Sequence, residues 1–470
     1  MKRFASASLA IASACLFAAS AGAGRARYGG TLHVRTAAAI ASTDPASRAA
    51  DTAERRAREQ TLAFVFETLT SIDHAGLRPA LATSWQSASG DARWRFRIRS
   101  GVRLHDGSIL QPWHVETALR RVEPDWKIAA GAEEVTIDLP APQADLPWTL
   151  ARRQFAIAVQ GGARDPLGTG PFRIDRLDGR RLTLRAHDGC WTGRPFVDAI
   201  DVDMGQPIAD GVAALERGRV DIAPAPQTDL RRLAQRGLRT IASQPRDIFV
   251  LVFEPHRAEG GDAPVRRALA AAIDRSAICT VLLQSACDPA PTLVPRWLSG
   301  YAPLMPAVDR AAARAAAAPL PAARRALTIR VEPTDPIARA VADRIAVDGR
   351  ETGLAVTVQA PTGLAPRPDA RLLHLAVEEM TADRVLAEIA TALGARVVAP
   401  SGAAPAPGLP LDAVYRAERA LLASDVVVPI VHVASVYGIG ERVEFAGPSA
   451  VLPSGAWDAA NVWLRPERQP

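Results

Sequence analysis

The clearest pattern in the chain is a strict alternation of apolar and polar residues over 93–99. Trp94, Phe96 and Ile98 take the apolar positions, and arginines occupy the positions between them. Successive side chains of a strand point to opposite faces, so this pattern predicts a half-buried strand of an antiparallel sheet. Shorter runs of the same kind predict further strands at 29–35, 134–139 and 248–253, and a hairpin from 172–174 and 181–185.

Apolar residues spaced three and four apart predict helices between these strands. We expect helices at 51–70, 264–283 and 336–352. The third lies between apolar strands at 327–331 and 354–358, an order that predicts a β-α-β unit. The chain is therefore of the α/β class, with mixed sheets flanked by helices.

Two segments are defined by composition instead of periodicity. The alanine-rich residues 311–318 predict an exposed helix or a linker, and the proline- and glycine-rich residues 400–410 predict a linker or surface loop. With 470 residues, 48% of them hydrophobic, the chain is too long for one ordinary core. Two or three domains are expected.

The N-terminus has the pattern of a secretory signal. A short basic start precedes an apolar stretch at 9–19 and small residues at 21–23, which predicts a signal peptide over residues 1–23 and an exported, periplasmic protein. Cys15 lies inside the apolar stretch, but little apolar sequence precedes it, so a lipoprotein site is disfavoured. No later segment has the run of about 20 apolar residues that a spanning helix needs.

The net charge does not indicate nucleic-acid binding. The formal charge is +6, from 56 basic and 50 acidic residues, and Lys2 and Lys127 are the two lysines of the sequence. The arginines are scattered among the acids and form no basic tail, so a weak preference for anionic partners is all that the charge implies.

A longer pattern appears at residues 62–121. Glu67 and Leu69 are followed by Pro-Ala-Leu-Ala-Thr-Ser-Trp at 79–85, the strand described above, and then Ile-Arg-Ser-Gly-Val-Arg-Leu-His-Asp-Gly at 98–107. This order resembles the signature of the family 5 extracellular solute-binding proteins, the oligopeptide, dipeptide and nickel receptors of ABC importers. There, a helix ending in Glu-x-Leu precedes Pro-x-Leu-Ala-x-Ser-Trp and Leu-Arg-x-Gly-Val-x-Phe-His-Asp-Gly.

The resemblance continues along the mature chain. Matching segments occur in the family's order at 165–174 (DPLGTGPFRI), 215–224 (LERGRVDIAP), 264–278 (PVRRALAAAIDRSAI) and 453–464 (PSGAWDAANVWL). These motifs are structural and identify a fold; none of them contacts a ligand directly.

The resemblance implies a type II periplasmic binding protein with two lobes and three parts. Lobe 1 would comprise residues 30–50, 168–246 and 436–470, with a subdomain at 51–167 attached to it, and lobe 2 would comprise 247–435. A solute, by default a peptide, would bind between the lobes, which close about a hinge and then dock on an inner-membrane ABC permease. A metal chelate, a sugar, or a sensor or chaperone role remains open, and a monomer without cofactors is expected.

The chain also departs from the family. Trp113-His114 replaces the usual Glu-Asp near a helix start, which predicts the loss of a capping carboxylate. The connection after Arg121 is short. So is the stretch at 381–412, where relatives carry a loop against the ligand, so a remodelled pocket is expected.

Three pairs of residues are candidates for ligand contacts. Ser42 and Thr43 precede an Asp-Pro turn, and their hydroxyls would hydrogen-bond a ligand or cap the local turn. Arg246 and Asp247 lie where the chain passes between the lobes, facing the cleft or paired with each other. Glu378 and Glu379 follow an apolar strand and would either hold a peptide's α-ammonium group or form a solvated strand end.

No catalytic or metal site is expected, and an exported hydrolase is the less favoured reading. The sequence contains no His-Glu-x-x-His, Cys-x-x-Cys or Gly-x-Ser-x-Gly motif. His187 and Cys190 are three apart, but their segment resembles the family's Asn-x-x-Tyr-Trp-x-Gly-x-Pro turn, so Cys190 is expected in a packed position. Cys279 and Cys287, eight apart around a helix end, are the expected disulfide in an exported protein.

Overall fold

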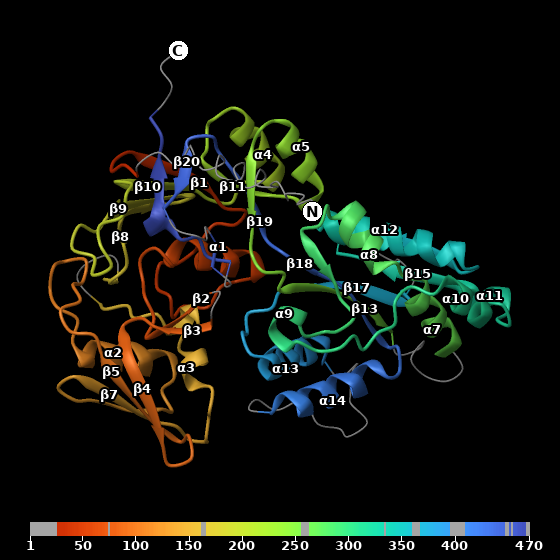
Figure 1. The fold of residues 1–470 in the computed structure, drawn as a ribbon, viewed down its shortest axis with the longest axis horizontal. Helices are drawn as coiled ribbons and strands as arrows, with labels where there is room; N and C mark the ends of the chain where they lie inside the picture. The colour runs from red at the N-terminus through yellow and green to blue at the C-terminus, as the bar shows by residue number, and fades with distance from the viewer. Residues whose placement is uncertain are drawn as a thin grey trace, which may run out of the picture.

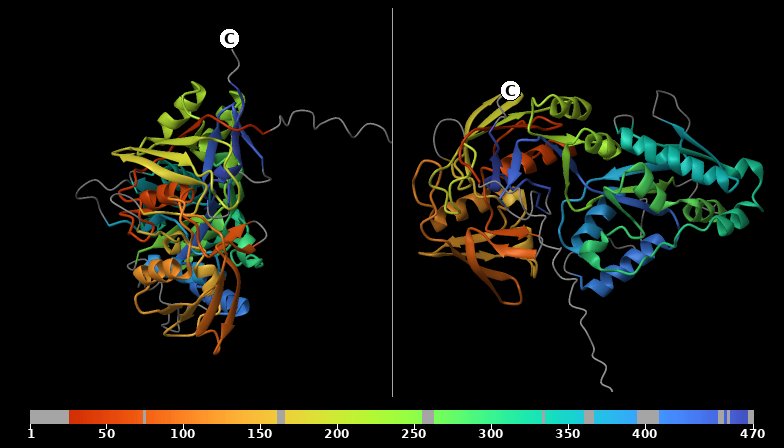
Figure 2. Two further views of the ribbon diagram at one scale, coloured as in Figure 1. Left: turned by 90° about the vertical axis from the view of Figure 1, so that its left-hand side faces the viewer. Right: turned by 45° about the horizontal axis from the view of Figure 1, so that its top comes forward.

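The computed structural model describes most of the chain, and the predicted signal peptide with Cys15 lies outside the described part. The described residues are 26–73, 76–160, 166–254, 263–332, 335–359, 367–394, 409–446, 451–452 and 455–466. Among them, none of the helices is both long and apolar enough to cross a membrane. A seven-stranded sheet at upper left, a four-stranded sheet below it and a six-stranded sheet at right form the framework (Figure 1). Figure 2 shows the six-stranded part set beside the other two.

The seven-stranded sheet takes its strands from three distant parts of the chain. In order across the sheet they are β12 (Arg239–Ala242), β19 (Val436–Ile439), β11 (Ile222–Ala225), β1 (Thr31–Arg35), β10 (Ala199–Asp203), β9 (Arg181–Ala186) and β8 (Phe172–Asp178). The central β1 is parallel to β10 and β11. β8 and β9 pair antiparallel, which confirms the predicted hairpin.

Short helices and a small hairpin complete this part. The helices are α4 (Ile208–Glu216), η2 (Gln227–Asp229), α5 (Leu230–Gln235) and η5 (Ala459–Asn461). β20 (Val443–Phe445) pairs antiparallel with β21 (Val462–Leu464).

The four-stranded sheet is entirely antiparallel. Its strands are β4 (Ala82–Ala88), β5 (Arg93–Ile98), β7 (Glu134–Asp138) and β6 (Lys127–Ala130). Trp94, Phe96 and Ile98 of β5 are buried, while the arginines between them are exposed, as the alternation predicts. The hairpin β2 (Thr70–Asp73) and β3 (Gly76–Pro79) and the helices α2 (Pro112–Val122), α3 (Leu146–Thr149) and η1 (Arg153–Phe155) belong to the same part.

The helix start at α2 keeps its cap although the family's carboxylates are missing. Nδ1 of His114 accepts a hydrogen bond from the N–H of Gln111 at 2.9 Å. Burial lowers the pKa of His114, so the ring is neutral at pH 7 and can accept. An imidazole therefore takes the place of the capping carboxylate.

The six-stranded sheet forms the second large part of the molecule. Its strands are β14 (Cys287–Pro289), β18 (Val427–Val433), β13 (Asp247–Phe253), β17 (Ala370–Leu375), β15 (Ala326–Arg330) and β16 (Ala355–Gln359). β15 and β16 are parallel and joined through α12 (Pro336–Glu351), which confirms the β-α-β unit. The other helices are α7 (Ala263–Ala272), α8 (Arg275–Ala277), η3 (Ile278–Leu282), α9 (Arg296–Ser299), α10 (Arg310–Ala317), α11 (Ala322–Arg325), α13 (Ala382–Leu393) and α14 (Leu411–Leu422).

The helix predicted at 51–70 is too long. α1 spans Thr52–Leu62, and the chain then leaves the helix to contact the glycine turn before β8. The carbonyl of Val65 accepts the N–H of Gly170 at 3.0 Å, and a Cβ on Gly168 would lie only 2.0 Å from that same oxygen. This long-range backbone pairing decides where the helix ends.

The helix predicted at 264–283 is also wrong as a single element. α7 ends at Ala272, and Oδ1 of Asp274 accepts the N–H of Ala277 at 2.9 Å, which starts α8. The side chain that caps the second helix therefore interrupts the first.

The alanine-rich segment is a helix with one covered face. Ala313 and Ala317 of α10 are buried where α10 packs against α7, so the expected exposed helix is wrong for that face. The predicted loop at 400–410 lies almost entirely outside the described residues, and Leu409 and Pro410 lead into α14.

Candidate ligand-binding cleft

Two short segments connect the seven-stranded and six-stranded sheets. Residues 243–246 join β12 to β13, and residues 434–435 join β18 to β19; we call them the crossing segments. They are bonded to each other, because Ser243 N–H donates to the carbonyl of Ser435 and Ser435 N–H donates to Oγ of Ser243, both at 3.0 Å. Hinge rotations between two parts of a protein are absorbed in short connecting segments of this kind.

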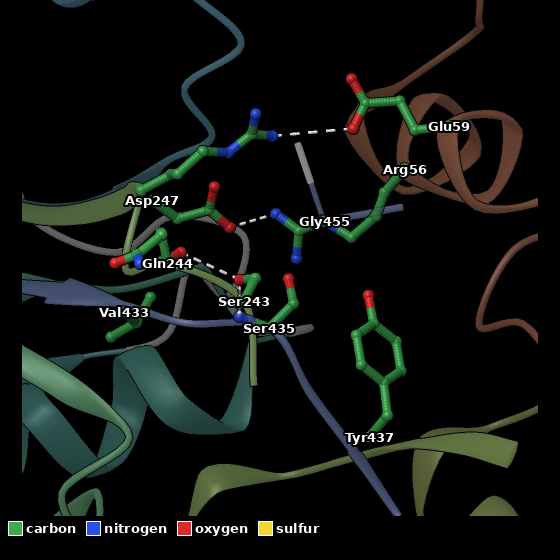
Figure 3. Close-up of a pocket in the computed structure, with 10 residues that line it drawn as sticks. Arg56, Glu59, Ser243, Gln244, Asp247, Val433, Ser435, Tyr437 and Gly455 are labelled. Atoms are coloured by element: carbon green, nitrogen blue, oxygen red, sulfur yellow. Dashed lines mark hydrogen bonds and ion pairs between the residues drawn. The ribbon is translucent and has the colours of Figure 1, made fainter. Parts of the chain in front are cut away.

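Helix α1 faces these crossing segments with charged side chains. Arg56 and Glu59, three residues apart, lie on one face of α1. Arg56 pairs with Asp247 at the start of β13, and Glu59 lies 3.6 Å from Arg246 (Figure 3). One helix and one strand are therefore joined by two neighbouring ion pairs.

The electrostatics of this group follow from its burial. Burial works against the charge on Asp247, but the nearby Arg56 and His374 outweigh it and hold the pKa of Asp247 below its ordinary value. Burial raises the pKa of Glu59, and Arg246 only partly opposes that rise. Asp247 is therefore a fixed negative charge, whereas Glu59 is easier to protonate than an exposed glutamate.

A small cavity lies between these side chains (Figure 3). Its volume of about 10 Å³ is close to the space needed for one water molecule. The lining residues are Arg56, Glu59, Ser243, Gln244, Arg246, Asp247, Val433, Ser435, Tyr437 and Gly455. The lining is almost entirely polar, and the charged side chains leave no room here for anything larger than a water molecule.

The acidic pair after β17 faces a second group of arginines. Glu378 pairs with Arg55 of α1, and Glu379 lies 2.8 Å from Arg152, which precedes η1. Burial raises the pKa of Glu379, although Arg152 opposes the shift. Both glutamates come from the six-stranded part. Arg55 lies on α1, which packs against the seven-stranded sheet, and Arg152 lies beside the core of the four-stranded sheet.

The backbone around the acidic pair is fixed by a third glutamate. The N–H groups of Glu378 and Glu379 donate to the carboxylate of Glu388 on α13, at 3.0 and 3.1 Å. Burial raises the pKa of Glu388, and the two N–H donors oppose that rise. One turn earlier in α13, Arg384 forms a bidentate pair with Asp145, with one contact at 3.0 Å.

Taken together, the ion pairs between the two sides run in both directions. Arg55, Arg56 and Arg152 pair with acids of the six-stranded part. Glu59 and Asp145 pair with its arginines Arg246 and Arg384. A solute that carries both charges could replace these pairs without leaving a buried charge unpaired.

Of the four residues predicted at the turn and at the crossing between lobes, two line the cavity and two do not. Oγ of Ser42 accepts the N–H of Asp44 at 3.1 Å, and Thr43 is buried; neither lines the cavity. Arg246 and Asp247 do line it, and each forms an ion pair with a residue of α1.

The acidic pair Glu378 and Glu379 also lies between the two parts of the molecule, paired with arginines. Glu378 and Glu379 are partly buried and ion-paired, so the reading as a solvated strand end is wrong. Sequence reasoning missed Arg55, Arg56 and Arg152. The dense charges of α1, with acids and arginines three and four apart, were the signal available for the first two.

The remaining cysteines and histidines form no metal centre within the described part of the chain. Cys190 is buried, with Sγ 3.2 Å from Oγ1 of Thr192, and burial raises its thiol pKa. His187 places Nδ1 3.2 Å from the carbonyl of Gly170. Cys279 and Cys287 are joined in a disulfide.

Comparison with known proteins identifies the class. The family model of the bacterial extracellular solute-binding proteins, family 5 Middle, matches residues 76–383. The match covers more than half of the chain, so the chain belongs to this family.

Individual relatives match over shorter stretches. The chain is 29% identical over 164 residues to the HTH-type transcriptional regulator SgrR of Pectobacterium atrosepticum, covering 32% of this chain and 29% of that protein. It is 22% identical over 270 residues to the dipeptide-binding protein of Escherichia coli, covering 47% of this chain and 50% of that protein. The chain thus spans half or less of the length of these curated relatives.

A solved structure matches nearly the whole fold. The ABC transporter substrate-binding protein from Sinorhizobium meliloti superposes with a TM-score of 0.73 at 21% identity, covering 93% of this chain and 100% of that one. The two-lobed fold expected from the sequence is confirmed.

Proposed function

We propose that this protein is the solute-binding component of an ABC importer, exported to the periplasm by the signal at 1–23. It binds its solute between two lobes and delivers it to a membrane permease; it is a monomer and has no catalytic activity. Lobe 1 comprises 30–50, 168–246 and 436–470, with the subdomain 51–167, and lobe 2 comprises 247–435. The family membership and the bonded crossing segments support this assignment.

The ion pairs of Glu378 and Glu379 with Arg55 and Arg152 carry the proposal. The solute is a small zwitterion, by preference a short peptide, in keeping with the similarity to a dipeptide-binding protein. Its ammonium group takes the place of Arg152 beside Glu379, and its carboxylate takes the place of Glu378 beside Arg55. The displaced Arg152 and Glu378, already 3.9 Å apart, then pair with each other, so no charge is left unpaired, and the lobes close on the solute.

The test is calorimetry with free peptides and with the same peptides acetylated at the N-terminus. A charge-assisted hydrogen bond favours the free ammonium group by about tenfold to a hundredfold in affinity. Glu379→Gln should bring free and acetylated peptides to similar affinity. Glu133→Gln is the matched control, because Glu133 is an exposed glutamate that pairs with exposed Arg97 at 2.7 Å on the four-stranded sheet.

Other outcomes would redirect the assignment. Binding of metal chelates or sugars but not of peptides would keep the receptor function and contradict the zwitterion. A sensor role without transport is the second candidate, because the chain resembles part of a transcriptional regulator. Deletion of the gene should abolish uptake of the bound solute; unchanged uptake with an altered transcriptional response would favour the sensor.

A further inference from the structure

The disulfide loop of lobe 2 makes an unexpected contact with lobe 1. Cys279 and Cys287 close a short loop between η3 and β14. Its tip contains Gln284 and Ser285, whose backbones lie in the left-handed region at φ 51° and 67°. Residues other than glycine adopt this conformation rarely, so the surrounding structure must hold the loop in place.

Gln284 reaches across to the start of α5. Its Oε1 accepts the N–H of Arg231 at 2.6 Å, and its Nε2 donates to the carbonyl of Thr228. The first N–H groups of a helix have no partner within the helix. A side chain of lobe 2 therefore caps a helix of lobe 1.

The same loop also holds one of the crossing segments. The N–H of Ala434 donates to the carbonyl of Ala286 at 3.1 Å, and the carbonyl of Ala434 accepts Nε2 of Gln227 at 2.7 Å. Ala434 is thus bonded on one side by lobe 2 and on the other by lobe 1.

Packing adds to these hydrogen bonds. Ala286 is buried in the small apolar cluster that contains Leu215 and Leu233 of lobe 1 and Val436 of β19. The loop is therefore seated in the core of the neighbouring lobe as well as bonded to its surface.

We propose that the disulfide-closed loop 279–287 limits how far the lobes open, because it is hydrogen-bonded to the start of α5 through Gln284 and to Ala434 through Ala286. We call this loop with its contacts the hinge bracket. A wider opening requires the bonds of Gln284 to break. The disulfide keeps the loop in the conformation that makes them. The inference rests on the lobe movement proposed above and adds the element that restrains it.

Hydrogen exchange at the Arg231 amide reports the bracket without any ligand. Gln284→Ala should speed this exchange about fivefold to tenfold, the factor for one hydrogen bond. Gln235→Ala, on the exposed end of α5, is the matched control and should leave the exchange unchanged.

The disulfide and the opening are tested separately. Cys279→Ala/Cys287→Ala should also speed exchange at Arg231. Small-angle scattering should show a larger radius of gyration for Gln284→Ala than for the wild type and for Gln235→Ala. The bracket would be overturned if the exchange rate of the Arg231 amide did not change in Cys279→Ala/Cys287→Ala. It would also be overturned if the radius of gyration did not change in Gln284→Ala. Failure to bind peptides would contradict the proposed function but would leave these two readouts intact.

Discussion

Replacing Asp247 by asparagine should remove the charge that holds α1 to β13. Asp247 is only 4% exposed, pairs with Arg56 and lies 3.8 Å from His374. Breaking a fully buried pair costs about 3–5 kcal/mol because a charge is left unpaired. The Arg56 side chain is 36% exposed, so water compensates part of that loss. We therefore expect a cost of about 2–3 kcal/mol in the free energy of unfolding.

Urea denaturation followed by circular dichroism measures this cost. Asp138→Asn is the matched control, because Asp138 pairs with the exposed Arg93 and its loss should cost less than about 1 kcal/mol. A double-mutant cycle with Arg56→Gln should recover most of the cost as coupling between Arg56 and Asp247. Equal costs for Asp247→Asn and Asp138→Asn, or no coupling, would refute the reasoning.

Three further predictions concern stability. Gly168→Ala should cost about 3 kcal/mol or more in urea denaturation, because its Cβ would lie 2.0 Å from the carbonyl oxygen of Val65; Gly131→Ala, with no contact under 3.4 Å, should be nearly neutral. His432 is buried with its pKa lowered to about 4, so the unfolded chain binds its proton first, and stability should fall by up to about 3 kcal/mol between pH 6.5 and 4. His432→Gln should flatten this fall in unfolding measured against pH. Burial raises the pKa of Glu418 to about 7, so the stability that Glu418 contributes has the opposite pH dependence and is lost as pH rises from 4.5 through 7. Glu418→Gln should remove that loss. A pH profile of unfolding that does not change in His432→Gln or in Glu418→Gln would contradict the effect assigned to that residue.

Local patterns were enough to predict the regular elements of the fold. The alternation in β5 and the β-α-β unit around α12 depend on periodicity alone, and both are confirmed. The ends of α1 and α7 depend on partners far away in the sequence, or on a cap that competes with the helix. Periodicity does not contain that information, so both helices were predicted too long.

The cleft was predictable only in part, for a similar reason. Glu378 and Glu379 could be found because they follow an apolar strand at a known place in the family's order. Their partners Arg55 and Arg152 lie in another part of the chain, and only the folded arrangement brings them opposite the acids. Gln284 had no signal in the sequence, because its role depends on a loop tip that meets a helix of the other lobe.

The most direct test of the central claim is native mass spectrometry of the protein isolated from its own periplasm. The account predicts a co-purified small molecule with both an ammonium and a carboxylate group, retained by the wild type and by Glu133→Gln. Glu378→Gln/Glu379→Gln should lose it. Retention of the solute by this double variant, or a wild-type protein that carries no solute and binds no peptide, would contradict the account.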